Sequence, residues 1–506
     1  MPPCIALRAD ASTRSGTGHV VRCLSLATEL RDTGVRTVLV SRRLGIDVSA
    51  LAQRAGVEFC ELRAPIDTYL RDADDPAHAD WAELPALIDA EETAATLISY
   101  SPRCVIVDHY AFDARWHRSV AAALGARIVA IDDLADRSIE ADILIDHNLA
   151  DDHAAKYRET NSNLGRVLGG PRFALLGPSY RFAKRYAFRD EVLSVGIFMG
   201  GSDPWNASLL VLDVLRKQCN FKGLIEIATT TANSHLADLQ ARCSFDGAAR
   251  LLVNEPSLHD FYSKHDIQIG AGGVASWERC CIGAPMLILK LAVNQHKVAD
   301  ALRTAGVARV VSRIEPDAIG HEFTNLCLDP VARRKMSELG PNLVDGLGAR
   351  RTAIAIRSHC LSMRLATMDD AAPSLVWRND PNTRRFFRDP AEIRLADHLH
   401  WWGSTLSNPQ YCLMIAEVGR KAVGIVRLDY NKLDAEISIY VDPTLTGLGL
   451  GPRMLNAVVT WVKTTRVGLT SLFADIDTCN RASEAAFSAA GFIRIAPTRW
   501  SKVLDS

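Results

Sequence analysis

The segment from Cys4 to Arg22 constrains the fold most strongly, because it joins a strand, a glycine-containing loop and a helix in one short stretch. Cys4 to Leu7 is apolar, as expected of a buried strand. Apolar residues from Val20 to Leu30 then recur at helical spacing until Gly34. This order predicts the first unit of a parallel sheet covered by helices.

The loop between that strand and helix is the first candidate ligand site. Gly16 and Gly18 let a ligand approach the backbone, and amides at a helix start favour an anion. His19 stands at this start, where the positive helix end favours a neutral imidazole that accepts a proton at pH 7. A tight turn with a capping histidine is the alternative. Further polar residues at the same strand end favour a ligand site over a simple turn, namely Arg8, Asp10, Ser12 and Arg22.

Length and composition limit the classes of protein to which the chain can belong. At 506 residues, and about 150 per domain, we expect three domains. The 58 basic and 59 acidic residues nearly cancel, which favours neither a nucleic acid nor a membrane as partner. The 12 cysteines include no Cys-x-x-Cys pair, and no carboxylate cluster has metal-ligand spacing, so neither disulfides nor a metal is expected. No long apolar run or leader pattern is present, and a cytoplasmic location is predicted.

Alternating strands and helices predict two similar α/β units in succession. The first, residues 1–186, has strands that end in polar groups, such as Asp108-His109-Tyr110. The second, residues 187–358, starts near Leu193 with a strand followed by Gly200-Gly201-Ser202-Asp203. Pro171 to Tyr186 is the expected hinge.

A second glycine loop gives the second unit its candidate site. Gly272 and Gly273 precede a helix, so their amides and the helix start can hold a diphosphate. Glu278 in the first turn can accept hydrogen bonds from ribose hydroxyls, although opposition to the helix dipole is the alternative role. The amides of Asn294-Gln295 can reach a phosphate or a sugar hydroxyl.

These motifs together resemble the UDP-2,4-diacetamido-2,4,6-trideoxy-β-L-altropyranose hydrolases of pseudaminic acid synthesis, over about the first 350 residues. The resemblance implies two Rossmann-like domains in a glycosyltransferase-B-like arrangement, with UDP on the second domain and the sugar against the first. It implies that His19 is the base that activates water, with Asp10 as the residue that orients its ring. It places the diphosphate on Gly272, Gly273 and Ser276, the ribose on Glu278, and the uracil near Asn254 to His259. The implied substrate-binding residues of the first loop are Arg8, Ser12, Gly16 and Gly18.

After about residue 359 the pattern changes to that of an α+β domain. Strands at Tyr411 to Glu417, Ala422 to Tyr430 and Ala435 to Val441 precede a glycine-rich turn and a helix. With Asn480 and Gly491-Phe492, this order resembles the Gcn5-related N-acetyltransferases and implies acetyl-CoA as cosubstrate. The implied cofactor-binding residues are Val441, Gly447, Leu448, Gly449, Leu450, Gly451, Asn480 and Ser483.

Two residues depart from that family's pattern. Thr446 replaces a basic residue or glutamine at the head of the turn, so phosphate contact relies more on backbone amides. Phe487 replaces the tyrosine that reprotonates the thiolate, and phenylalanine cannot donate a proton. Glu436 is a candidate base acting through water; a cross-strand salt bridge is the equally weighted alternative.

Trp377-Arg378-Asn379 and the fusion itself make the C-terminal domain similar to the UDP-4-amino-4,6-dideoxy-N-acetyl-β-L-altrosamine N-acetyltransferases. The resulting hypothesis is a bifunctional enzyme that acetylates a UDP-amino sugar and then hydrolyses the UDP-diacetamido sugar. The alternatives are a glycosyltransferase with an accessory acetyltransferase domain, and a C-terminal domain that binds without catalysing. The predicted partner is a small UDP-sugar, and the oligomeric state stays open.

Overall fold

The computed structural model describes residues 2–66, 69–161, 164–292, 295–465 and 468–504. Contacts between Cα atoms divide the chain into two compact units. The N-terminal unit consists mainly of Val35–Thr352 with the residues up to Arg31, and the C-terminal unit mainly of the residues from Ala353 onward. Each unit is described by itself.

The N-terminal unit contains a first sheet of eight strands, in the order β2-β3-β1-β5-β6-β7-β8 with β4 also paired to β3. All its pairs are parallel, and β1 lies between β3 and β5. The strands are β1 (Cys4–Ala9), β2 (Ala11–Ser12), β3 (Arg36–Leu44), β4 (Glu58–Leu62), β5 (Cys104–Asp108), β6 (Arg127–Ile131), β7 (Ile143–Asp146) and β8 (Arg166–Gly169).

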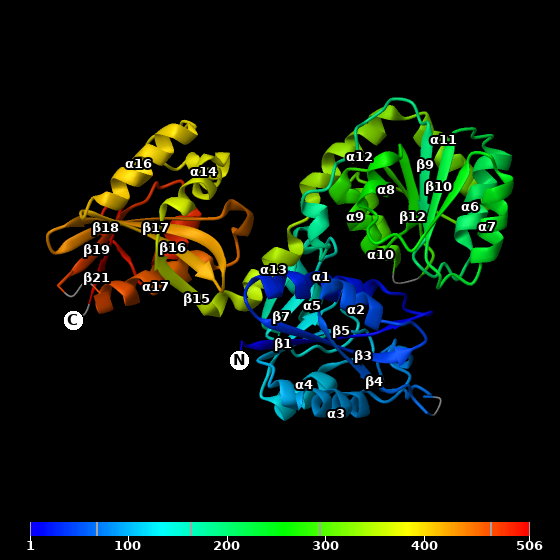
Figure 1. The fold of residues 1–506 in the computed structure, drawn as a ribbon, viewed down its shortest axis with the longest axis horizontal. Coiled ribbons are helices and arrows are strands. Elements are labelled where there is room, and N and C mark those ends of the chain that lie inside the picture. The colour runs from blue at the N-terminus through cyan, green and yellow to red at the C-terminus, as the bar shows by residue number, and fades with distance from the viewer. Residues whose placement is uncertain (1, 67–68, 162–163, 293–294, 466–467, 505–506) are drawn as a thin grey trace. The chain divides into compact units, whose positions relative to one another are not determined.

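Helices connect most of these strands, as is usual for parallel pairing. They are α1 (Gly18–Asp32), α2 (Ser49–Ala55), α3 (Ala86–Leu97), α4 (Ala114–Leu124) and α5 (His153–Arg158). Helices α3 and α4 pack together on one face of the sheet (Figure 1). The apolar residues of β1, β3, β5 and β6 form the core beneath them, with Trp116 of α4 fully buried.

A second sheet, of six parallel strands, follows in the order β11-β10-β9-β12-β13-β14. Its strands are β9 (Ser194–Phe198), β10 (Leu224–Thr229), β11 (Ala249–Val253), β12 (Ile267–Ala271), β13 (Met286–Leu289) and β14 (Arg309–Val311). Its helices are α6 (Ala207–Asp213), α7 (Leu236–Phe245), α8 (His259–Lys264), α9 (Val274–Ile282), α10 (His296–Thr304), α11 (Pro316–Cys327) and α12 (Pro330–Leu343). Helix α13 (Gly348–Arg357) follows and contains the boundary between the two units.

The C-terminal unit has a mixed sheet in the order β15-β16-β17-β18-β19-β21-β20. Its strands are β15 (Leu361–Leu365), β16 (Tyr411–Val418), β17 (Lys421–Asn431), β18 (Asp434–Val441), β19 (Ser471–Asp475), β20 (Ile493–Arg494) and β21 (Arg499–Val503). Its helices are α14 (Ala371–Asn379), α15 (Pro381–Arg384), α16 (Leu395–Ser407), α17 (Leu450–Thr465) and α18 (Arg481–Ala489). Helices α14 and α16 lie on one face of the sheet and α17 on the other (Figure 1).

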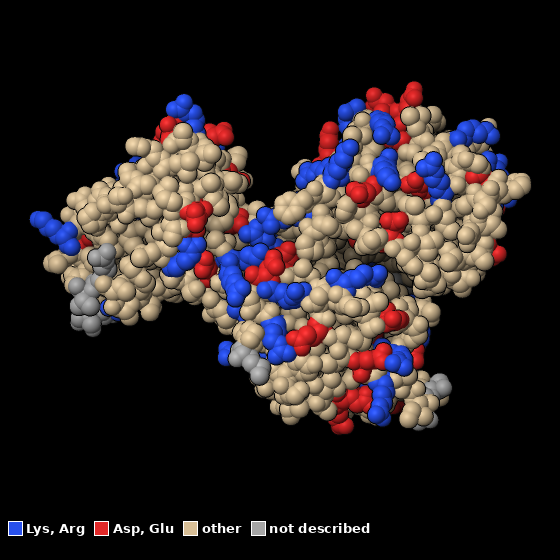
Figure 2. All heavy atoms as spheres, in the orientation of Figure 1, with Lys and Arg blue, Asp and Glu red and all other residues tan. Residues whose placement is uncertain are grey.

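The predicted fold class is therefore confirmed: two parallel Rossmann-like α/β sheets precede an α+β domain with a mixed sheet. Acidic and basic side chains are interspersed over the face in Figure 2. None of the helices in the described part of the chain combines the length and apolar character that a bilayer crossing requires.

Candidate active sites

His19 lies where the first glycine loop enters α1. Gly16 takes a φ of +72°, a conformation that favours glycine, and its amide donates to the Ser12 carbonyl at 2.8 Å. A Cβ atom added at Gly16 or Gly18 meets no atom within 4 Å, so there is open space beside both glycines. Ser12 shares its hydroxyl with Ser15 at 3.0 Å. The loop therefore leaves room for a ligand next to the histidine.

The partner of His19 is Asp108, at the carboxyl end of β5. Nδ1 of His19 lies 2.6 Å from Oδ1 of Asp108, and Arg22 donates to both carboxylate oxygens, at 2.5 and 2.6 Å. The Arg22 and His19 side chains hold the pKa of Asp108 well below its usual range, although burial opposes this shift. With Nδ1 donating to Asp108, Nε2 of His19 is the atom that can accept a proton.

The expectation that Asp10 orients His19 is wrong. Asp10 accepts from Arg8 at 2.5 Å and from the backbone amide of Arg42 at 2.6 Å, so it fixes the loop after β1 instead. Arg8 is itself fully buried, because Asp10 and Asp89 neutralise it. The structure therefore places Arg8 in a buried ion cluster and not where a substrate contacts it.

Two aromatic residues also lie beside His19, and sequence reasoning missed one of them, Trp81. Tyr110 meets the imidazole edge to face at 4.8 Å, and Trp81 does so at 6.3 Å. His78 packs against both aromatic rings. Tyr110 follows a polar strand end that the sequence flags, but His78 and Trp81 belong to the long connection between β4 and α3, which carries no motif.

The second glycine loop lies between β12 and α9. Gly273 is the residue before the helix, and a Cβ atom there meets no atom within 4 Å. Behind the loop, the buried Arg279 donates to the carbonyl of Phe198 at 2.9 Å and that of Ala271 at 3.3 Å. Ser276 is fully buried, and its hydroxyl has no hydrogen-bond partner among the described residues. The loop backbone therefore offers more to a diphosphate than the serine does.

Glu278 lies in α9 just after the first turn, so the prediction that it belongs to the first turn is wrong. The buried Tyr262 donates to its Oε2 at 3.0 Å, and burial raises the pKa of the carboxyl. Tyr180 also acts on this carboxyl, so two tyrosines surround it.

The remaining residues expected near the nucleotide divide into three cases. Gln295 lies by Gly272, and its Oε1 accepts from the amide of Leu291 at 3.2 Å. Asn254 is exposed and accepts from the amide of Thr231 at 3.1 Å. Asn294 lies outside the described residues.

In the C-terminal unit, the glycine-rich turn presents backbone and not side chains. Gly447 and Gly449 are exposed with φ of +79° and +70°, whereas Leu448 and Leu450 are buried in the core. Helix α17 begins at Leu450, and Gly451 lies in its first turn. This is the geometry of an anion site at a helix start.

The neighbouring elements complete the candidate cofactor site. The pairing of β18 with β19 ends at Glu436, although β18 continues to Val441. Asn480 caps α18 by accepting from the amide of Ser483 at 3.1 Å, so its carbonyl oxygen has a structural role.

Glu436, the candidate base, and Phe487, at the position where a tyrosine is expected, both contact other residues of the domain. Glu436 forms an ion pair with Arg499 at 3.1 Å and lies 3.8 Å from Arg388. It does not line the cavity described next, which favours the salt-bridge alternative over the role of base. Phe487 is buried and packs against Phe492.

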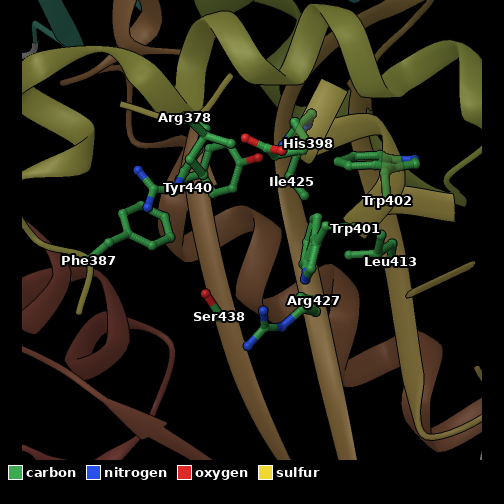
Figure 3. Close-up of a pocket in the computed structure, with 12 residues that line it drawn as sticks. Arg378, Phe387, His398, Trp401, Trp402, Leu413, Ile425, Arg427, Ser438 and Tyr440 are labelled. Carbon is green, nitrogen blue, oxygen red and sulfur yellow. The ribbon is translucent and has the colours of Figure 1, made fainter. Parts of the chain in front are cut away.

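A cavity of about 230 Å³ lies between the C-terminal sheet and helices α14 and α16 (Figure 3). Cross-strand pairing brings Ile425 beside Tyr440 and Arg427 beside Ser438 on its floor. The other lining residues come from the helices, their connection and β16: Arg378, Phe387, Ile393, Asp397, His398, Trp401, Trp402 and Leu413. Sequence reasoning noted only Arg378 among the lining residues, as part of a motif.

Residues 361–493 match the acetyltransferase (GNAT) domain family. The C-terminal unit is therefore an acetyltransferase domain of the GNAT type.

The whole chain resembles an uncharacterised protein of Methanocaldococcus jannaschii, with 22% identity over 96% of each chain. The spore coat polysaccharide biosynthesis protein SpsG of Bacillus subtilis is 22% identical over 69% of this chain and 97% of its own length. Among solved structures, MurG of Acinetobacter baumannii aligns with a TM-score of 0.47 and 14% identity over 70% of this chain and 98% of that chain.

Proposed function

We propose that the chain is a bifunctional enzyme of nonulosonic acid synthesis. Its C-terminal unit transfers an acetyl group from acetyl-CoA to the 4-amino group of a UDP-4-amino-4,6-dideoxy-N-acetyl-altrosamine. Its N-terminal unit hydrolyses the product, UDP-2,4-diacetamido-2,4,6-trideoxy-L-altrose, to UDP and free sugar. The similarity to SpsG, named for polysaccharide biosynthesis, supports carbohydrate chemistry in the N-terminal unit.

The arrangement of His19 and Asp108 carries the hydrolase proposal. Asp108 holds Nδ1, so Nε2 takes the proton of a water molecule as the water oxygen bonds to the anomeric carbon. The bond between that carbon and the diphosphate oxygen breaks, and UDP leaves with the electron pair. Attack opposite the leaving group inverts the anomeric centre. The amides at Gly272 and Gly273 receive the diphosphate, and Glu278 the ribose.

The acetyl transfer uses the glycine-rich turn and the cavity. The backbone from Gly447 to Gly451 binds the pyrophosphate of acetyl-CoA, and the part of β18 beyond Glu436 faces the pantetheine arm. The acceptor amine attacks the thioester carbonyl, and the amide forms as the thiolate of coenzyme A leaves. The ammonium proton goes to water or to the thiolate, because Phe487 cannot take part.

The decisive experiment follows UDP release and acetylation in the same variant. His19→Ala should abolish UDP release from the UDP-diacetamido sugar while acetylation of the UDP-amino sugar persists. His321→Ala, at an exposed position of α11, should change neither rate. Undiminished UDP release by His19→Ala would contradict the assignment of the base.

A glycosyltransferase is the second candidate, because UDP-sugar hydrolases of the proposed kind and nucleotide-sugar glycosyltransferases are expected to share one fold. A hydrolase releases UDP at full rate from the UDP-sugar alone, whereas a glycosyltransferase requires an acceptor hydroxyl. A C-terminal unit that only binds would release no coenzyme A from acetyl-CoA in the presence of the amine.

A further inference from the structure

Arg378 is a buried cation that lines the cavity of the C-terminal unit, and it has no ion-pair partner within 4 Å among the described residues. Its side chain projects from α14, and the residue is 8% exposed. Nη2 donates to the carbonyl of Asp389 at 2.9 Å, whereas Nη1 is buried and has no hydrogen-bond partner among the described residues. The ring of Phe387 lies 3.8 Å from the guanidinium carbon (Figure 3). A cation–π contact replaces only part of the lost hydration.

The other charged groups of the cavity are already paired. Asp397 accepts from Arg394 at 2.8 Å, and Arg427 contacts Asp429 at 2.7 Å. Among the described residues that line the cavity, Arg378 is the one charged side chain without an ion-pair partner within 4 Å.

The two remaining titratable groups of the lining do not change this balance. His398 lies 3.1 Å from the Ser374 hydroxyl, and burial lowers its pKa, so it is neutral at pH 7. Burial raises the pKa of Tyr440, which is neutral as well. Among the described lining residues, one arginine is therefore left without an ion pair, and the one carboxylate is paired.

We infer that the molecule acetylated in this cavity binds Arg378 through an anionic phosphate group. A pocket for a polyamine needs several carboxylates to neutralise its ammonium groups, whereas the one carboxylate of this lining is paired with an arginine. A phosphate accepts two parallel hydrogen bonds from a guanidinium, which would satisfy Nη1. The exposed part of Trp401 adds a flat apolar surface beside Arg427. The phosphorylated amine, and not the free amino sugar, is then the acceptor.

This inference rests on the proposed acetyl transfer, and its test separates the two. Initial rates of coenzyme A release are measured with the UDP-4-amino sugar, with the free 4-amino sugar and with spermine. The wild type should prefer the UDP-linked amine in kcat/KM by a hundredfold or more. Arg378→Gln should lower kcat/KM for that acceptor by about ten- to a hundredfold, mainly through KM, and change the free sugar less than twofold.

Arg385→Gln is the matched control, because Arg385 also stacks on a phenylalanine, Phe386, but is exposed and does not line the cavity. It should leave both kinetic constants unchanged. Arg378→Lys, which keeps the charge and loses the planar fork, should give an intermediate KM. Unaltered KM for acetyl-CoA in each variant shows that the domain is folded.

The outcomes are distinct. Equal acetylation of the free and UDP-linked amines, or an equal loss for both in Arg378→Gln, overturns the inference while acetyl transfer stands. A preference for spermine overturns it too. If the wild type acetylates none of the three acceptors, the proposed acetyltransferase function fails and the inference fails with it.

Discussion

The rings of Phe487 and Phe492 meet edge to face, with centroids 4.9 Å apart and an interplanar angle of 75°. Both residues are 3% exposed, so hydrocarbon fills the position where the resemblance to the Gcn5-related N-acetyltransferases predicts a tyrosine. The leaving thiolate must then be protonated from elsewhere.

Phe487→Tyr should therefore raise kcat for acetyl transfer by a few fold, because a phenol supplies general-acid catalysis that is otherwise missing. Steady-state release of coenzyme A measures this rate, and the KM for acetyl-CoA should not change. A lower kcat with unaltered thermal stability would show that protonation of the thiolate does not limit the reaction.

Glu436→Gln should lower acetylation less than about threefold, because its carboxylate is committed to Arg499 and lies outside the cavity. The ion pair is partly exposed, so its loss should cost under about 1 kcal/mol of unfolding free energy. A hundredfold loss, together with a changed pH profile of kcat, would instead establish Glu436 as the base.

Asp108→Asn should lower kcat for UDP release by a hundredfold or more, because an amide neither fixes the tautomer of His19 nor stabilises the imidazolium. Asp10→Asn is the informative comparison, since Asp10 contacts Arg8 and not His19. Asp10→Asn should lower the free energy of unfolding, and it should lower kcat for UDP release less than Asp108→Asn does. The reverse ranking of the two kcat values would restore Asp10 as the residue that orients the base.

Asp89→Asn should destabilise the N-terminal unit by about 3 to 5 kcal/mol, because the buried arginines Arg8 and Arg42 would lose their shared carboxylate. Glu92→Gln is the matched control: Glu92 contacts the same Arg42 but is 45% exposed, and should cost under about 1 kcal/mol. Chemical denaturation of both variants gives the two free energies. Equal costs would mean that burial does not set the value of these ion pairs.

Stability should fall between pH 7 and pH 5. Burial lowers the pKa of His109 and His147 to about 4 and that of His117 to about 3. The unfolded chain, with pKa near 6.5, binds protons in this range while the folded chain does not, so acid favours unfolding by up to about 2 kcal/mol per histidine at pH 5. Denaturant titrations at both pH values measure the change. His321→Gln, at an exposed site, should leave the change of the unfolding free energy with pH as in the wild type. A free energy of unfolding that does not depend on pH would contradict the prediction.

Most of the fold follows from the sequence because local patterns determine its elements. Buried parallel strands such as Val105 to Val107 are continuous apolar runs, and the glycine loops mark where each strand passes to a helix. The short strands β8 and β14 were not predicted. Arg166–Gly169 and Arg309–Val311 lie at the ends of their sheets, and pairing with one neighbour gives little sequence signal.

The candidate site was predictable only in part. The sequence indicates His19 and a set of strand-end carboxylates, but the choice among them depends on strand order. Because β5 pairs with β1 so that Asp108 lies opposite Ala9, Asp108 reaches the imidazole and Asp10 does not. Trp81 and the cavity around Arg378 depend on long connections and on helix packing, which no local pattern encodes.

The early end of the pairing between β18 and β19 has a consequence for how the C-terminal unit holds together. An extended amide-containing chain such as pantetheine has the spacing of a β-strand. It can pair with β18 beyond Glu436, where β19 no longer does. Bound acetyl-CoA would then act as an additional strand of the sheet as well as a reagent. The rigidity of the sheet should therefore rise with the fraction of the protein that has acetyl-CoA bound.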